Sequence, residues 1–120
     1  MRIIKYKAKD NNGIWWYGSL VKKDKYYIID ENGEHDNLDV DTISECTGES
    51  DIWHDLVYEN DIVLFKTIGT SELYYGLVFY EDGSFCVEVC DEHGYKDKKN
   101  NSTFYFHEII INEVVSNLYH

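Results

Sequence analysis

The sequence has 120 residues, of which 43% are hydrophobic and 16% aromatic, and it carries a formal charge of −12. This length fits one domain spanning 1–120, and the aromatic content excludes an intrinsically disordered chain. No apolar run reaches the ~18 residues that cross a bilayer, and the first residues lack a signal-peptide pattern, so we expect a cytoplasmic protein with no membrane partner.

The first strands are indicated by short runs of β-branched and aromatic residues between turn residues. Strands are expected over 2–8, 14–21 and 25–30, with turns at 10–13 and 22–25, which makes a small antiparallel meander. Side chains alternate across a strand, so Trp15 and Tyr17 share one face and Trp16 lies on the other. At least one large aromatic therefore faces outward or into a second layer, and an exposed tryptophan would mark a binding surface.

The charge is concentrated in the next part of the chain, the acidic segment 30–61. It holds twelve acidic residues and no lysine or arginine, and the rest of the chain is neutral. A field of this sign repels duplex DNA and attracts basic partners, so we expect an unidentified protein partner, basic or DNA-binding in kind. Self-association stays open. The candidate partner-binding residues are Asp30, Glu31, Glu34, Asp36, Asp39, Asp41, Trp16 and Trp53.

The acidic segment is expected to be largely irregular, with a short strand at 40–44. Its stretch 30–41 has the oxygen side chains of a calcium loop, but His35 stands where that loop needs glycine and Asp41 where it needs glutamate. We expect no specific calcium site. In "LVYENDIVLF", Glu59 and Asp61 flank a tight turn, where carboxylates accept backbone N–H groups, so we interpret this pair as a brace and not a ligand site.

The clearest hairpin covers 74–90. A two-residue turn at Asp82 and Gly83 places Glu81 opposite Ser84 and continues to Gly76 opposite Val89. Both faces are rich in apolar residues, which suits the wall of a partly open, SH3-like β-barrel element or a sandwich. A polar loop at 91–102 and a strand at 103–106 follow. The last stretch fits one helix, or a short helical turn and then a strand at 113–118, and its β-branched residues favour the strand.

Candidate catalytic and metal-ligating residues are sparse. Cys86 and Cys90 lie ~13 Å apart on a strand, too far for one metal ion to bridge, and no second ligand pair completes a site at Cys90 and His93. Three cysteines are an odd number, and the chain shows no signal-peptide pattern, so we expect no disulfide framework. Cys46, Cys86 and Cys90 are expected to be free thiols, buried or half-buried as small hydrophobes. His54 beside Asp55 has no nucleophile motif to accompany it. We expect no enzyme, cofactor or metal.

An alternative function uses the basic residues. Lys5, Lys7 and Lys9 alternate along one strand, near Tyr6, Tyr26 and Tyr27, whose rings could stack on the bases of a single strand. This arrangement would make the protein a nucleic-acid-binding β-barrel. Ordinary solvated strand faces explain the same lysines more simply.

Several segments together resemble the YopX-like family of phage and prophage proteins, over almost the whole chain. They are "RIIKYKAKD" with "GIWWYGSL", "ECTGESDIWHDLVYENDIVLF", "GLVFYEDGSFCVEV" and "NEVVSNLY". The matching residues are Thr47, Gly48, Asp51, Tyr58, Glu59, Asp61, Ile62, Val63, Gly76, Val78, Gly83, Phe85, Val114, Asn117 and Tyr119. Asn60 and Ser116 stand where the family has glycine. The resemblance implies a small, mostly β fold of phage origin that acts inside a bacterial host and has no known activity.

These observations lead to one functional hypothesis. The protein is expected to be a noncatalytic phage or prophage accessory protein that binds a host or phage protein through an acidic surface. Within that class, acids spaced along a surface could mimic DNA phosphates and occupy a nucleic-acid-binding protein.

Overall fold

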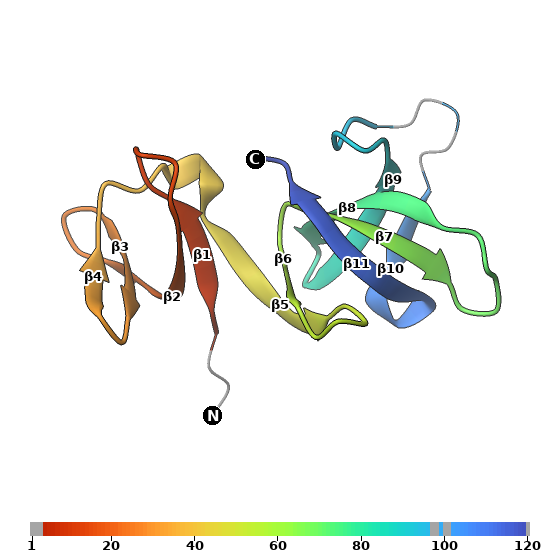
Figure 1. Ribbon diagram of the computed structural model, residues 1–120, viewed down its shortest axis with the longest axis horizontal. Helices are drawn as coiled ribbons and strands as arrows, with labels where there is room; N and C mark the ends of the chain where they lie inside the picture. Colours follow the sequence, from red (N-terminus) through yellow and green to blue (C-terminus); the bar gives the residue numbers. More distant parts are fainter. Residues whose placement is uncertain (1–3, 97–98, 100–101, 120) are drawn as a thin grey trace. The chain divides into compact units, whose positions relative to one another are not determined.

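The computed structural model describes residues 4–96, 99 and 102–119. In these residues eleven strands form two antiparallel sheets, and the helices are two 3-10 turns of three residues each (Figure 1). Neither sheet closes into a barrel in the part of the chain described. The mainly β fold is therefore confirmed. The chain gathers into two compact units, Met1–Cys46 and Thr47–His120; that it unfolds as one domain stays a prediction.

The first unit is the expected meander with one added strand. Its strands pair in sequence order, and the start of β5 pairs with the other side of β1. They are β1 (Tyr6–Lys9), β2 (Trp15–Lys22), β3 (Tyr26–Asp30) and β4 (Gly33–His35), followed by β5 (Ser44–Ser50). The added strand, β4, follows a tight turn in which the Asp30 carboxylate accepts the N–H of Asn32 at 2.8 Å. Residues 2–3 of the predicted first strand lie outside the described residues.

The prediction of a largely irregular acidic segment is wrong. It contains β4, the 3-10 turn η1 (Val40–Thr42), β5 and β6 (Leu56–Tyr58). The predicted strand at 40–44 is η1 up to Thr42, and Ser44 then begins β5. The signal was missed because β5 reads "SECTGES", which has almost no apolar residues to alternate; its strand geometry comes from pairing with β1 and β6.

The second unit is built around a five-stranded sheet in the order β10-β9-β8-β7-β11. Its strands are β7 (Asp61–Thr67), β8 (Tyr74–Glu81), β9 (Ser84–Cys90), β10 (Thr103–Tyr105) and β11 (Ile109–Asn117), with the 3-10 turn η2 (Phe106–Glu108) before β11. The core cluster lies on one face of this sheet. Its buried members are Val57, Val63, Phe65, Val78, Val87, Val89, Ile109 and Ile111.

The β8–β9 hairpin has the predicted register at every pair, from Glu81 opposite Ser84 to Gly76 opposite Val89. Asp82 has φ 51° and Gly83 φ 84°, so both central residues take the left-handed conformation that a two-residue hairpin turn requires. The central residues of both strands are buried or half-buried on each face of the hairpin, as the apolar pattern indicated.

β11 is a single strand from Ile109 to Asn117. The helical turn that the sequence also allowed ahead of residue 113 is therefore wrong over 109–111. The predicted strand at 113–118 is confirmed as far as Asn117. Irregularities in the pairing with β7 fall between Ile111 and Glu113 and between Val114 and Ser116. Each inserts an extra residue, which shifts the alternation of buried side chains and gives the apolar residues a helix-like spacing.

Candidate functional site

Trp16 is held inside the first unit by a chain of polar and ring contacts. Its indole N–H donates to Asp10 Oδ2 at 2.9 Å, and its ring stacks on His35 with centroids 3.7 Å apart. His35 Nε2 in turn lies 2.9 Å from Asp30 Oδ2. The hydrogen bond from His35, with the N–H of Asn32, lowers the pKa of Asp30 below its ordinary value. Trp16 therefore fixes β4 to β2, and Tyr17 is the exposed aromatic of this strand.

A shallow hollow in the first unit brings together three of the eight predicted partner-binding residues. Trp16, Asp30 and Glu31 line this Trp16 hollow, whose volume is about 400 Å³, together with Lys5 and Tyr17. Because Lys5 lies among the two carboxylates, the hollow is of mixed charge. The hollow therefore holds only part of the predicted partner-binding set.

Two more of the predicted acids are paired with lysines of the β2–β3 turn. Lys23 Nζ lies 2.6 Å from Glu34 Oε1, and Lys25 Nζ lies 3.2 Å from Asp36 Oδ2. These hydrogen bonds raise the pKa of both lysines. All four side chains are about half-exposed, so the pairs add little stability. Their effect is to offset charge, which leaves Asp39 and Asp41, exposed at η1, as the remaining acids of the predicted set.

Folding distributes the charge differently from the sequence. The first unit holds nine acidic and seven basic residues, a formal charge of −2, because the lysines of 5–25 accompany the first acids of the acidic segment. The second unit holds fourteen acidic and four basic residues, a formal charge of −10. The excess negative charge thus belongs to the second unit.

Trp53, the last of the predicted residues, stands on a braced loop of the second unit. The buried carboxylate of Asp51 accepts the N–H of Trp53 at 2.8 Å and of Asp55 at 2.9 Å through Oδ1. Its Oδ2 accepts the N–H of Val114 at 3.1 Å, which ties the loop to β11. His54 completes the tight loop with φ 67°. The indole of Trp53 is 67% exposed, so a rigid backbone presents a large aromatic side chain to solvent.

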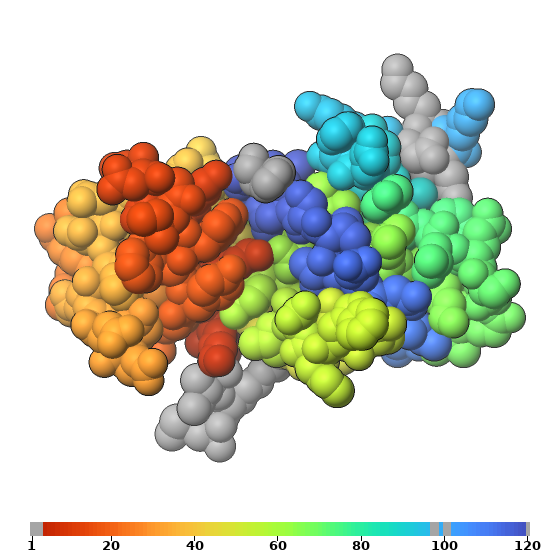
Figure 2. Space-filling model, in the orientation of Figure 1, coloured from red at the N-terminus to blue at the C-terminus, as the bar shows by residue number. Residues whose placement is uncertain are grey.

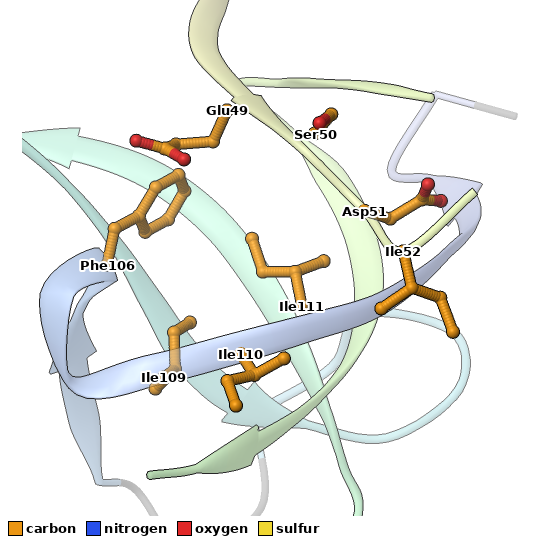
Figure 3. A pocket seen from close by; sticks show the side chains of 8 residues that line it. All are labelled: Glu49, Ser50, Asp51, Ile52, Phe106, Ile109, Ile110 and Ile111. Carbon is orange, nitrogen blue, oxygen red and sulfur yellow. The ribbon is translucent and has the colours of Figure 1, made fainter. Parts of the chain in front are cut away.

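A second hollow lies beside this loop, and sequence reasoning missed it. This isoleucine hollow has a volume of about 240 Å³. Figure 3 shows Phe106 and the first residues of β11 on one side and, on the other, the end of β5 with the two residues that follow it. Its lining residues are Glu49, Ser50, Asp51, Ile52, Phe106, Ile109, Ile110 and Ile111. The walls are mainly apolar, and Glu49 places an exposed carboxylate at the rim.

Asp61 acts as the predicted brace. It is 1% exposed, and its Oδ2 accepts the N–H of Tyr58 at 2.8 Å across the turn. Its Oδ1 accepts the side-chain amide of Asn117 at 3.0 Å, which fixes the end of β11. Asn60 has φ 70°, the conformation for which asparagine is the best substitute for glycine. Glu59, the other acid of the pair, is half-buried.

Asp51 should make the stability of the second unit depend on pH. Burial acts to raise the pKa of its carboxyl group, but the N–H groups of Val114, Asp55 and Trp53 outweigh burial and lower it below the ordinary 3.8. A lowered pKa stabilises the fold fully above the unfolded pKa and loses that contribution as the pH falls through the folded pKa.

We therefore expect the difference in unfolding free energy between the native chain and Asp51→Asn to be constant down to about pH 5 and to shrink below it. Urea unfolding between pH 7 and pH 3 measures this difference. Trp53→Ala, which keeps the carboxylate, should retain the native pH slope. A difference that grows at low pH would contradict this account.

The basic faces are less open than the nucleic-acid alternative needs. Lys7 is buried, with Nζ 5.0 Å from the ring centroid of Trp15. Lys22 lies over Tyr26 at 5.3 Å and Lys23 over Tyr27 at 5.4 Å. Ammonium groups of the neighbouring strand end and turn thus lie over Tyr26 and Tyr27, two of the three rings that were to stack on bases. The expectation of a shared, solvated lysine face is wrong for Lys7.

The three cysteines lie inside the fold. All three thiols are buried, as predicted, and burial, with Asp91 and Glu88, raises the pKa of Cys90 to about 11. A thiol with a raised pKa is a poor nucleophile. Within the described residues, no three His, Cys, Asp or Glu side chains gather as a metal site would require.

In comparisons with known proteins, no family model and no curated protein matches this chain. Among the described residues, no helix has the length and apolar character to cross a membrane.

Proposed function

We propose that the protein is a noncatalytic binding module that captures a basic protein through its second unit. The observation that carries this proposal is the exposed indole of Trp53, held on a braced loop within a unit of formal charge −10. Tryptophan is the residue type most enriched among the side chains that dominate binding energy. Because the Asp51 hydrogen bonds already order the loop, little conformational entropy is lost when a partner binds.

Charge supports the choice of a basic partner. Glu49 and Asp55 are exposed on either side of Trp53 in the sequence, and the isoleucine hollow adds an apolar surface beside them. An apolar centre with a charged rim is the usual composition of a protein interface. The same charge opposes duplex DNA and slows the association of two copies of the unit. Mimicry of DNA toward a DNA-binding protein is the sharpest form of this proposal.

We also propose membership of the YopX-like family, with action in the cytoplasm of a bacterial host as a phage or prophage accessory protein. The support is structural in kind. The residues that carry the resemblance include those that brace the second unit: Asp51 and Asp61 as described, and Thr47, whose hydroxyl donates to the carbonyl of Val57 at 2.9 Å. Residues whose substitution would leave a buried polar group unpaired are those that a shared fold retains.

The nucleic-acid alternative has less support. Lys7 and Lys9 flank Trp15, but Tyr26 and Tyr27 are covered by Lys22 and Lys23. We expect no mobility shift of single-stranded DNA at about 50 mM salt, where electrostatic binding is strongest.

The test is capture from bacterial lysate with the purified protein as bait. We expect the captured proteins to be enriched in basic or DNA-binding proteins at low salt, and their yield to fall at high salt. Trp53→Ala should lower this yield about tenfold or more. Tyr95→Ala is the matched control, because it removes an aromatic side chain that is 72% exposed elsewhere in the same unit. The proposal would be contradicted if Trp53→Ala left the yield of captured proteins unchanged, or if the captured proteins included no basic ones.

A further inference from the structure

The register of β11 determines which of its backbone groups face away from the sheet. Ile68 N–H donates to the carbonyl of Glu108 at 3.1 Å, so Glu108 faces β7. Residues of an antiparallel strand alternate between facing the partner and facing away from it. Ile109 and Ile111, which lie opposite Thr67 and Phe65, therefore direct their backbone groups away from β7. β11 is the end strand of the sheet, so these groups form its outer edge.

The outer edge is closed at both ends by intramolecular hydrogen bonds. At one end the N–H of Ile109 donates to the carbonyl of Phe106 within η2. At the other end the N–H of Val114 donates to Asp51 Oδ2. Between them lie the carbonyl of Ile109 and the N–H and carbonyl of Ile111, the stretch that we name the β11 edge. This spacing of acceptor, donor and acceptor is that of a strand ready to pair.

The β11 edge adjoins the isoleucine hollow, and Ile109 and Ile111 are themselves only 7% and 8% exposed. Ile109 and Ile111 line the hollow, and Figure 3 shows Phe106 and Ile52 at its two ends, with Ile110 on the same strand. In the space-filling view the blue surface of β11 adjoins the yellow-green surface of the segment after β5 (Figure 2). An added strand would thus find backbone partners and, beside them, an apolar hollow for one of its alternate side chains.

We propose that the β11 edge and the isoleucine hollow bind an extended segment of a basic partner, which adds to β11 as a further strand. This inference rests on the proposed function, because it takes the partner to be a basic protein. The segment would pair with Ile109 and Ile111 and place one apolar side chain in the hollow. Its lysine or arginine side chains, on the alternate positions, would lie near the exposed carboxylates Glu49, Glu108 and Glu113.

Charge and backbone chemistry favour an extended basic segment over a second copy of the chain or a helical partner. A second copy of the chain would bring a second unit of formal charge −10 to the edge, so pairing of two β11 strands is opposed. A helical partner has its backbone groups engaged internally and could not pair with Ile111. An extended basic segment satisfies both the charge and the open donor and acceptors.

The experiment uses a defined probe, a fluorescein-labelled ten-residue peptide of alternating lysine and valine, with the full-length protein. We expect saturable binding by anisotropy, and protection of the Ile111 amide from hydrogen exchange by about tenfold or more, measured by NMR. The same peptide with N-methylated valines keeps its charge and apolar groups but loses backbone donors, and it should bind about tenfold more weakly.

Two matched variants locate the site. Ile52→Lys places an ammonium group at the hollow and should weaken binding about tenfold or more. Ile68→Lys makes the same change of charge on another exposed isoleucine of the same unit and should leave the affinity within about twofold. Both variants alter exposed side chains, so both should keep the native circular dichroism spectrum.

Three results overturn strand addition: no binding of the peptide, binding without protection of Ile111, and equal affinity of the N-methylated peptide. Each leaves the capture that depends on Trp53 standing, since that assay does not require pairing at the β11 edge. Conversely, loss of lysate capture with retained protection of Ile111 would overturn the proposed function and keep the strand-adding edge.

Discussion

Replacing Asp61 with asparagine is expected to lower the free energy of unfolding by about 2–3 kcal/mol, measured by urea denaturation. The carboxylate accepts hydrogen bonds on both oxygens, from the N–H of Tyr58 and the amide of Asn117. An asparagine at 61 would turn an NH2 group toward one of these donors. Asn117 cannot compensate by rotating its amide, because its Oδ1 already accepts the N–H of Tyr119 at 2.9 Å.

The control for this prediction is Glu113→Gln, which removes one charge from an exposed position of β11. We expect it to change the unfolding free energy by less than about 0.5 kcal/mol, as exposed substitutions usually do. If Asp61→Asn behaves like this control, Asp61 is not the brace that the structure indicates, and its charge alone accounts for its place in the sequence.

Gly76→Ala is expected to lower the unfolding free energy by about 1–3 kcal/mol, through overpacking of the second unit's core. A Cβ at position 76 would lie 2.7 Å from Cε1 and 2.9 Å from Cδ1 of Phe65. Phe65 is fully buried among Val63, Val78 and their neighbours, so its ring has no free space into which to move. The glycine is therefore needed for the close approach of a side chain across β7 and β8.

A double-mutant cycle tests this explanation. In a Phe65→Leu background the ring is gone, and Gly76→Ala should cost at least about 1 kcal/mol less than in the native chain. Urea unfolding of the four proteins gives the coupling energy. A coupling near zero would mean that the cost of Gly76→Ala has another origin, such as a backbone shift in β8.

Features with a local cause could be predicted from the sequence. The β8–β9 register follows from two adjacent residues, Asp82 and Gly83, whose left-handed conformations allow a single pairing. The brace at Asp61 follows from a turn of four residues. In both cases the interacting groups are close in the chain, so the residue types alone specify the geometry.

Elements whose structure depends on contacts far apart in the sequence could not be predicted. β5 carries few apolar residues, and its pairing with strands on both sides makes it a strand. β11 has a helix-like apolar spacing because two irregularities adapt it to β7. Periodicity predicts an element only when the alternation of buried side chains is unbroken, and neither strand meets that condition.

By itself the sequence determined the mainly β class, the hairpins and the total charge, since these depend on composition and neighbouring residues. Only the tertiary structure decided that the first unit is nearly neutral while the second keeps a charge of −10. It also decided which edge of β11 is open. The hydrogen bond from Val114 to Asp51 joins residues 63 positions apart, and no local pattern encodes a contact that chain folding alone brings about.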